Sequence, residues 1–393
     1  MTSVLVVDDS QFMRTVVGNI LSGQGYEVHR AVDGESGVDT ARDLEPDIVT
    51  MDVKMPGMDG IEAVDEIMAT CPTRILMLSA HTEAGADATL EALAKGAVDF
   101  MAKADEERLS DLDDLESRLT EKIEAVERAD ISSIVAERAA SAAARSAERT
   151  AAVADSMAET TAGTSTADGA LDVETTVAPD IAGGGPVVTV ERPGSHGTPT
   201  VVVGASTGGP KVVERILYEL PADLRARVLV VQHMPASFTD RLAARLNTLS
   251  EYDVTEASHG RRVGPGEAVV AKGGVHLRVA EEDGDELRLR LTKSERRHGV
   301  RPAIDVTMES VADAVSTPLV GVALTGMGRD GAAGIEAIKQ AGGATVAQDE
   351  ASSPVFGIPK QAIETGCVDS VLDVCDLTRG IVDAATTNGD THG

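Results

Sequence analysis

Hydrophobic residues in the first hundred positions form short runs that alternate with amphipathic stretches. Each run has the length of a buried strand, and the stretch Gln11 to Ser22 between the first two has helical spacing. Strands that alternate with helices predict a parallel sheet covered on both faces. Apolar residues at steps of three and four from Leu109 to Val126 then predict one long helix that closes this domain. The five strand-like runs are SVLVVDD, YEVHRA, DIVTMDV, RILMLSA and GAVDFMAK.

The same patterning divides the chain into regions. Residues 1–128 are predicted to form a (βα)5 flavodoxin-like domain. Residues 129–198 are rich in Ala, Ser, Thr and acidic residues, without an apolar face wide enough to dock, which predicts a flexible linker. Strands and helices alternate again over residues 199–385, which predicts a second α/β domain with a doubly wound, mostly parallel sheet. Strand-like sequence at 267–291 predicts an antiparallel excursion in or beside this sheet. Residues 386–393 are predicted to be a disordered tail.

Composition narrows the class of protein. No apolar run approaches the ~20 residues that span a bilayer, and no signal sequence precedes the first strand, so we expect a cytoplasmic protein without membrane insertion. Three cysteines (Cys71, Cys367 and Cys375) are too few and too scattered for a disulfide framework or a zinc site. A net charge of −30 argues against nucleic acid as a partner.

The acidic composition comes with few lysines and few aromatic residues. Only 9 of the 35 basic residues are lysines, and aromatic residues make up 2% of the chain. An acidic, lysine-poor surface suits concentrated salt, where repulsion between carboxylates is screened. We therefore expect a halophilic host, with a merely acidic protein as the alternative.

Polar residues follow the strands of the first domain. Asp8 and Asp9 end the first run, Asp52 ends the third, Ser79 ends the fourth and Lys103 follows the fifth. Because the carboxyl ends of parallel strands share one edge, we expect these side chains to converge. Carboxylates that are crowded together repel one another unless a cation lies among them, and a site with only oxygen ligands suits Mg²⁺. With the lysine and the hydroxyl beside it, the site can also hold a phosphoryl group, and Asp52 can attack it.

This pattern, with DVKMPGMDG running from Asp52 to Gly60, resembles the receiver domain of response regulators over residues 1 to 128. The resemblance implies that a histidine kinase phosphorylates Asp52. The sequence departs from the family at Ala104, where receivers usually have a cis proline. A cis Lys103–Ala104 bond would cost about 3 kcal/mol, so either the strain is kept or the loop is rearranged. The remaining implied roles are metal binding by Asp8, Asp9 and Asp52, and switching by Ser79, Phe100 and Lys103.

In the second domain, a valine-rich strand leads into Gly204-Ala205-Ser206-Thr207-Gly208-Gly209 and then a helix. A G-x-S-x-G turn between strand and helix presents the serine hydroxyl above the sheet edge, close to free N–H groups of the helix. By itself the turn is also compatible with cradling a phosphate or nucleotide.

A nucleophilic serine needs a base, and the next strand ends in His233, within QHMP. A later strand runs toward Asp330, within GRDGA, which can orient the imidazole. Ser206, His233 and Asp330 are therefore the predicted catalytic triad. His276 and His298 remain as less favoured candidates for the base, because neither ends an apolar strand next to the serine.

The motifs GASTGGP, QHMP and LTGMGRDGA, joined to a receiver, resemble the chemotaxis protein-glutamate methylesterase family over residues 1–128 and about 199–385. This resemblance implies that the backbone N–H groups of Thr207 and Met327 form the oxyanion hole. Arg329 stands where an uncharged residue is more usual, next to Asp330, and either lowers its pKa or contacts acidic substrate.

The resemblance also implies a function. The triad would hydrolyse glutamate γ-methyl esters on methylated chemoreceptors, releasing methanol, and would deamidate receptor glutamines more slowly. The unphosphorylated receiver would pack over the serine and phosphorylation would weaken that packing. Alternatives are a phospho-regulated esterase for another acyl ester and a binding-only regulator; a transcriptional regulator would need a basic helix-turn-helix, which an acidic α/β domain does not offer.

Overall fold

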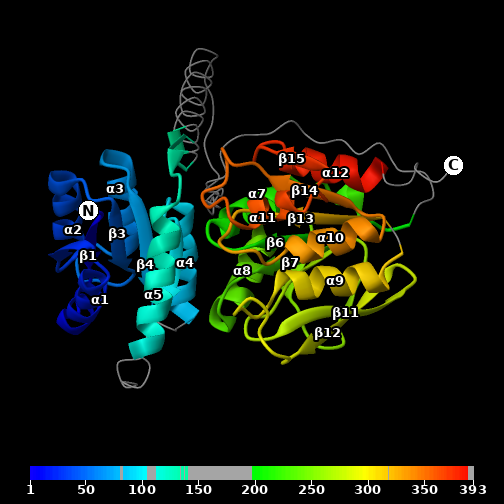
Figure 1. Cartoon of the computed structure of the whole chain (residues 1–393), viewed down its shortest axis with the longest axis horizontal. Helices are drawn as coiled ribbons and strands as arrows, with labels where there is room; N and C mark the ends of the chain where they lie inside the picture. The colour runs from blue at the N-terminus through cyan, green and yellow to red at the C-terminus, as the bar shows by residue number, and fades with distance from the viewer. Residues whose placement is uncertain are drawn as a thin grey trace, which may run out of the picture.

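The computed structural model describes two α/β domains side by side (Figure 1). The linker residues from 140 to 196, the Lys103–Ala104 bond and the tail after 387 lie outside the described residues. No helix in the described part of the chain is both long and apolar enough to cross a membrane. The described residues are 1–79, 83–103, 112–132, 134–136, 138–139, 197–316 and 318–387.

The N-terminal domain has a five-stranded parallel sheet in the order β2-β1-β3-β4-β5. The central strands β1 and β3 are buried almost throughout, which is why their sequences are continuous apolar runs. The strands are β1 (Ser3–Val7), β2 (Glu27–Ala31), β3 (Ile48–Asp52), β4 (Arg74–Ser79) and β5 (Asp99–Ala102). The helices are α1 (Gln11–Gly23), α2 (Gly34–Leu44), α3 (Gly60–Thr70), α4 (Glu83–Ala94) and α5 (Leu112–Glu127).

The C-terminal domain has a seven-stranded parallel sheet in the order β15-β14-β13-β6-β7-β10-β8. Its strands are β6 (Thr200–Ala205), β7 (Arg227–Gln232), β8 (Asp253–Glu256), β10 (Glu267–Val270), β13 (Leu319–Ala323), β14 (Ala344–Gln348) and β15 (Ser370–Leu372). The helices are α7 (Gly209–Glu219), the 3-10 helix η2 (Ala222–Leu224), α8 (Ala236–Leu249), α9 (Ile304–Ala314), α10 (Ala332–Gln340), α11 (Ile358–Glu364) and α12 (Leu377–Thr387).

A smaller sheet in the order β11-β12-β9 stands apart from the parallel one. It is antiparallel, so the predicted α/β class with an antiparallel excursion is confirmed. The excursion is only part of the region where it was expected, because β10 pairs in parallel with β7 and β8. The strands of the small sheet are β9 (Arg262–Val263), β11 (His276–Asp283) and β12 (Glu286–Thr292).

The two domains touch along α4 of the first, which packs against α7 and α8 of the second. At the same boundary the Phe100 ring lies 4.4 Å from the Phe238 ring, centroid to centroid. Packing also continues beyond the predicted domain end at residue 128. The carbonyl of Ala129 accepts a hydrogen bond from Arg74, and the Asp130 N–H donates to Pro354 in the C-terminal domain.

Candidate active site and phosphorylation site

The structure brings the three predicted triad residues to one edge of the C-terminal sheet. Ser206 follows β6 and His233 follows β7, while Asp330 lies in the loop after β13. Because β6 pairs with both β7 and β13, the three come from adjacent strands. All three line one cavity of about 510 Å³, called here the active-site cavity.

His233 and Asp330 form a direct contact, with Nε2 of the imidazole 2.8 Å from Oδ2 of the carboxylate. The carboxylate is 2% exposed and also accepts hydrogen bonds from the backbone N–H groups of Ile304 (2.7 Å) and Asp305 (2.9 Å). Burial disfavours the charged form of Asp330, but the contact with His233 and the two N–H donors outweigh it and hold its pKa below the usual value. The carboxylate is therefore an ionised, fixed acceptor for the imidazole.

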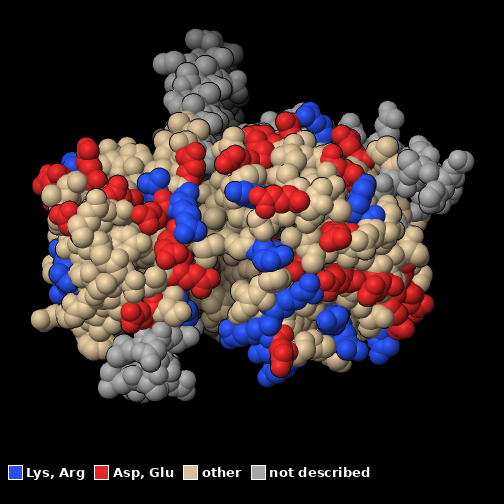
Figure 2. Space-filling model, viewed as in Figure 1, with Lys and Arg blue, Asp and Glu red and all other residues tan. Residues whose placement is uncertain are grey.

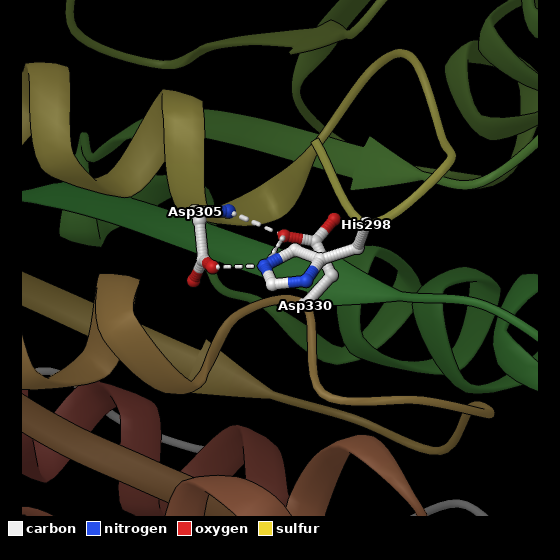
Figure 3. A group of neighbouring side chains, drawn as sticks. All are labelled: His298, Asp305 and Asp330. Atoms are coloured by element: carbon white, nitrogen blue, oxygen red, sulfur yellow. Dashed lines mark hydrogen bonds and ion pairs between the residues drawn. The ribbon is translucent and has the colours of Figure 1, made fainter. Parts of the chain in front are cut away.

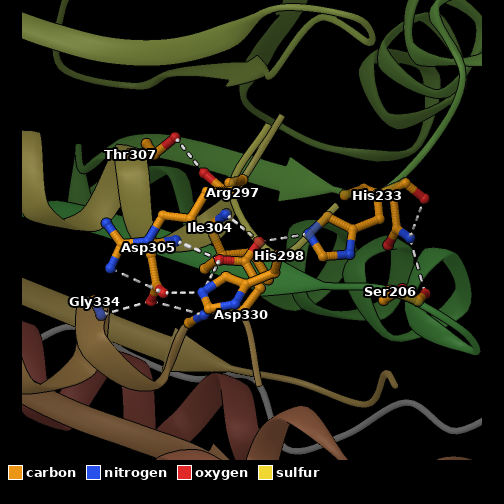
Figure 4. Close-up of polar contacts among 12 residues, drawn as sticks. Ser206, His233, Arg297, His298, Ile304, Asp305, Thr307, Asp330 and Gly334 are labelled. Atoms are coloured by element: carbon orange, nitrogen blue, oxygen red, sulfur yellow. Dashed lines mark hydrogen bonds and ion pairs between the residues drawn. The ribbon is translucent and has the colours of Figure 1, made fainter. Parts of the chain in front are cut away.

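The turn that carries Ser206 is held by backbone and amide contacts. The Ser206 N–H donates to the carbonyl of Thr325, and the Gln232 side-chain amide donates to the Ser206 carbonyl at 2.8 Å (Figure 4). The loop after β13 passes so close that a Cβ added to Gly326 would lie 2.6 Å from the Ser206 Cβ. Among the described residues no hydrogen bond joins the Ser206 hydroxyl to His233, whose Nδ1 is left for that role because Nε2 holds Asp330.

A second histidine–carboxylate pair lies beside the first. Nε2 of His298 is 2.7 Å from Oδ2 of Asp305 and 3.9 Å from the Asp330 carboxylate (Figure 3). The other Asp305 oxygen accepts the N–H groups of Gly331 and Gly334, at 2.8 Å each. Asp305 therefore caps the start of α10 and fixes the loop that ends in Asp330. Sequence reasoning considered His298 only as a base and missed Asp305, which sits in no motif.

The ligand atoms of His298, Asp305 and Asp330 all lie within 4.8 Å of one another. Each carboxylate oxygen nevertheless already accepts a hydrogen bond, and both Asp330 oxygens accept backbone N–H groups. These hydrogen bonds make the trio a support for the predicted triad.

His276, the other alternative base, is buried away from the serine. Its Nε2 lies 2.9 Å from the Glu295 carbonyl, and its Nδ1 accepts the Ala303 N–H. Burial lowers its pKa. Both ring nitrogens are thus used to hold the loop before α9, which is a structural role.

Of the two residues implied for the oxyanion hole, Met327 is half-buried and Thr207 is buried, and both line the active-site cavity. The Thr207 hydroxyl donates to Oδ2 of Asp99 in the receiver at 2.6 Å. The Lys122 ammonium also lies 2.5 Å from this Asp99 oxygen. A carboxylate of the first domain is therefore bonded to the residue next to the nucleophile, a contact that sequence patterns do not signal.

At the edge of the N-terminal sheet, Lys103 joins two carboxylates. Its ammonium lies 2.7 Å from Oδ2 of Asp8 and 2.8 Å from Oδ2 of Asp52. Asp9 completes the group, and ligand oxygens of the three acids all lie within 4.8 Å of one another. Burial raises the pKa of Asp52 and the neighbouring Asp8 adds to the rise, which Lys103 only partly offsets.

The two remaining predicted switch residues make contacts of their own. Ser79 is buried, and its hydroxyl donates to the carbonyl of Gly85 at 3.1 Å. Phe100 is 5% exposed and stacks at a 33° tilt on Phe238 of α8, the helix that begins three residues after His233. The receiver aromatic thus contacts the helix next to the predicted base.

These two sites define a response-regulator receiver joined to an α/β hydrolase domain, and comparison with known proteins confirms both resemblances. The CheB methylesterase family matches residues 201–381, and the response regulator receiver domain matches residues 4–112. Because full-length relatives are also 46–48% identical, the chain belongs to the CheB-type methylesterase family.

Relatives named protein-glutamate methylesterase/protein-glutamine glutaminase match nearly the whole chain. One from Halobacterium salinarum is 48% identical over 98% of this chain and 99% of its own length. One from Haloarcula marismortui is 46% identical over 98% and 97%. The crystal structure of the Thermotoga maritima CheB methylesterase catalytic domain is 39% identical and covers 48% of this chain and 98% of its own, with a TM-score of 0.46.

Proposed function

We propose that this protein hydrolyses glutamate γ-methyl esters on methylated chemoreceptors and that phosphorylation of Asp52 controls the rate. The observation that carries the proposal is the 2.8 Å contact between His233 and an ionised Asp330, in the cavity that Ser206 also lines. Both the names of the relatives and the family membership support the substrate.

In the proposed reaction, the Ser206 hydroxyl attacks the ester carbonyl while Nδ1 of His233 takes its proton. Asp330 stabilises the resulting imidazolium through Nε2. The backbone N–H groups of Thr207 and Met327 stabilise the oxyanion. Collapse of the tetrahedral intermediate breaks the bond to methoxide, which leaves as methanol with the proton from His233. Water activated by His233 then attacks the acyl-enzyme, restoring the serine and leaving a free glutamate carboxylate.

Incubation of the full chain with methyl-labelled receptor membranes tests this proposal, with released methanol as the readout. We expect release by the native chain and none above background by Ser206→Ala. Absence of methanol from the native chain would favour an esterase for another acyl group. Equal release by the serine variant would favour a binding-only regulator whose C-terminal domain is not a hydrolase.

The same site is proposed to deamidate receptor glutamines, as the names of the relatives indicate. An amide passes through a similar tetrahedral intermediate but needs stronger protonation of its leaving group, so we expect the slower rate. Release of ammonia from receptors that carry glutamine, compared between the native chain and Ser206→Ala, tests this activity.

The regulatory half of the proposal concerns Asp52. A histidine kinase would transfer a phosphoryl group to this carboxylate, and the family implies a Mg²⁺ ion there. Asp8, Asp9 and Asp52 fit that ion, because their oxygens converge within 4.8 Å. Bound there, Mg²⁺ would neutralise phosphoryl oxygens; Lys103 would hold another of them. Phosphate uptake from a small-molecule phosphodonor, absent in Asp52→Asn, tests this part.

The contacts between the domains support a route from Asp52 to the esterase. The bond between Thr207 and Asp99 and the stacking of Phe100 on Phe238 hold the receiver against the active-site cavity. We infer that phosphorylation shifts the population toward a state in which this contact is broken and substrate enters. Asp99→Asn should raise basal methanol release without a phosphodonor; unchanged release would contradict this route.

A cytoplasmic location is also proposed. The three cysteines are free thiols, as expected in a reducing compartment. Cell fractionation with detection of the chain tests the location, and recovery of the chain outside the cytoplasm would contradict it.

A further inference from the structure

Three arginines of the C-terminal domain line the active-site cavity together with the predicted triad, and Arg118, Glu121 and Lys122 of the receiver line it as well. Arg296 and Arg301 lie in the loop between β12 and α9, and Arg329 immediately precedes Asp330. Arg296 and Arg329 are exposed, and Arg301 is half-buried. On the face shown in Figure 2, basic side chains gather on the C-terminal domain beside the groove that separates it from the receiver.

None of these three arginines has a carboxylate partner within the part of the chain that the structure describes. Arg296 donates only to the Gly299 carbonyl, and Arg301 to the carbonyls of Lys293 and Ser294. The Nε of Arg301 is buried without a hydrogen-bond partner.

The neighbouring Arg297 differs, because it is not among the residues that line the cavity and it binds Glu309 at 2.6 Å and Asp305 at 3.3 Å. Acidic residues outnumber basic ones by 65 to 35 in this chain, so carboxylate partners are plentiful. These three arginines are thus left available to an anionic ligand at the cavity that Ser206 lines.

The chemistry of the guanidinium group selects the kind of anion. Its planar fork donates two parallel hydrogen bonds to a carboxylate, and it stays charged at every working pH. The methyl ester that Ser206 would attack is neutral and needs no such partner. The groups that the arginines recognise must therefore lie beside the ester on the substrate.

We propose that Arg296, Arg301 and Arg329 form a subsite that binds free carboxylates flanking the scissile ester, so that the preferred substrate is an acidic peptide segment. This inference rests on the proposed esterase function. It also gives Arg329 the role of a specificity residue at the position where the family usually has an uncharged one. In concentrated salt the screening length shrinks to about 3 Å, so the subsite works by direct contact and not by long-range attraction.

Two synthetic peptides test the proposal. Each carries a single glutamate γ-methyl ester, flanked by glutamates in one and by glutamines in the other, and methanol release by the full chain gives kcat/KM for both. We expect the glutamate-flanked peptide to be preferred by about tenfold, mostly through KM, as for one charge-assisted contact. Equal values for the two peptides would overturn the subsite while leaving the esterase intact.

Arg329→Gln should lower kcat/KM for the glutamate-flanked peptide much more than for the glutamine-flanked one, so that most of the preference is lost, and Arg329→Glu should reverse it. Arg225→Gln is the matched control, because Arg225 is exposed but precedes β7, at the opposite end of the strand from His233. Arg296→Gln provides a second exposed variant. A preference that survives Arg329→Glu would overturn the proposal, and failure of the native chain on both peptides would count against the esterase function itself.

Discussion

The two candidate sites occupy the same position in their domains, at the carboxyl edge of a parallel sheet, yet they treat a buried aspartate in opposite ways. Asp52 in the receiver has a raised pKa, and Asp330 in the hydrolase domain has a lowered one. Asp52 shares the Lys103 ammonium with Asp8 and accepts one long bond from the Lys54 N–H (3.4 Å), whereas Asp330 accepts two shorter backbone N–H bonds and contacts an imidazole. Burial favours the neutral carboxyl at both sites; it prevails at Asp52, and the donors around Asp330 outweigh it there.

The difference suits the two chemistries. A carboxylate that is poorly compensated by the protein has capacity left for a cation and for a phosphoryl group. A carboxylate that is fully compensated stays ionised and fixed, as an imidazole partner must. Asp52 thus suits the proposed phosphoryl transfer, and Asp330 suits the proposed role of holding His233.

The largest expected effect is that of Asp330→Asn. An asparagine keeps the shape but loses the charge that orients His233, so kcat for methanol release should fall by about 10³- to 10⁴-fold. The matched change Asp52→Asn should leave the unstimulated rate within about twofold, measured in the same assay. A rate for Asp330→Asn within tenfold of the native rate would contradict the comparison.

Removal of divalent cations should separate the two sites. With a chelator present, a phosphodonor should no longer stimulate methanol release, because Asp8, Asp9 and Asp52 would lack their cation. The unstimulated rate should stay the same, since the triad uses no metal. Added Mg²⁺ should restore stimulation in the native chain and not in Asp8→Asn. A chelator that stops the unstimulated reaction as well would argue for a metal near Ser206.

The hydrogen bonds that Asp305 accepts from the loop after Asp330 should contribute measurably to the free energy of unfolding. Asp305→Ala removes the acceptor for the N–H groups of Gly331 and Gly334 and leaves them buried. We expect the free energy of unfolding in urea to fall by about 1–3 kcal/mol, and kcat to fall with it. Asp313→Ala serves as control, because Asp313 is an exposed residue of the same helix. A loss of unfolding free energy no larger than that of the control would show that Asp305 does not stabilise this loop.

Acid unfolding should reveal that folding lowers the pKa of Asp330 and raises the pKa of Asp52. Asp330 contributes stability at pH values above the ordinary aspartate pKa, and this is lost as pH falls through its lower folded pKa. Asp52 binds a proton more readily in the folded state, so acidification favours folding through this group.

The loss of unfolding free energy between pH 7 and pH 3 should therefore be smaller in Asp330→Asn than in the native chain, and larger in Asp52→Asn. Urea unfolding at the two pH values measures both. Equal slopes in the three proteins would show that neither carboxylate titrates differently on folding.

The smallest expected effect concerns the acidic surfaces of the two domains. The chain has 30 more acidic than basic residues, so added salt should screen the repulsion between carboxylates and raise the melting temperature. Thermal unfolding in rising KCl measures it. A melting temperature that does not rise would remove the argument for adaptation to concentrated salt.

Much of the candidate site could be predicted because short motifs place residues at strand ends. Ser206, His233 and Asp330 follow apolar strands, and parallel strands bring their ends together without any long-range information. The same reasoning located Lys103 and Asp52. It could not find Asp305, whose carboxylate lies in the first turn of α9 and acts on a loop that is distant in the sequence.

What the sequence determined by itself is the set of elements and the chemistry at their ends, since hydrophobic spacing and turn motifs are local properties. Only the tertiary structure decided which groups meet across elements: Asp99 with Thr207, His298 with Asp305, and, around one cavity, three arginines of the C-terminal domain that have no carboxylate partner among the described residues. These pairings depend on how helices and loops pack over the sheets, and packing is settled by the whole fold at once. The pKa of each buried aspartate follows from that packing, because it depends on donors that several distant segments contribute.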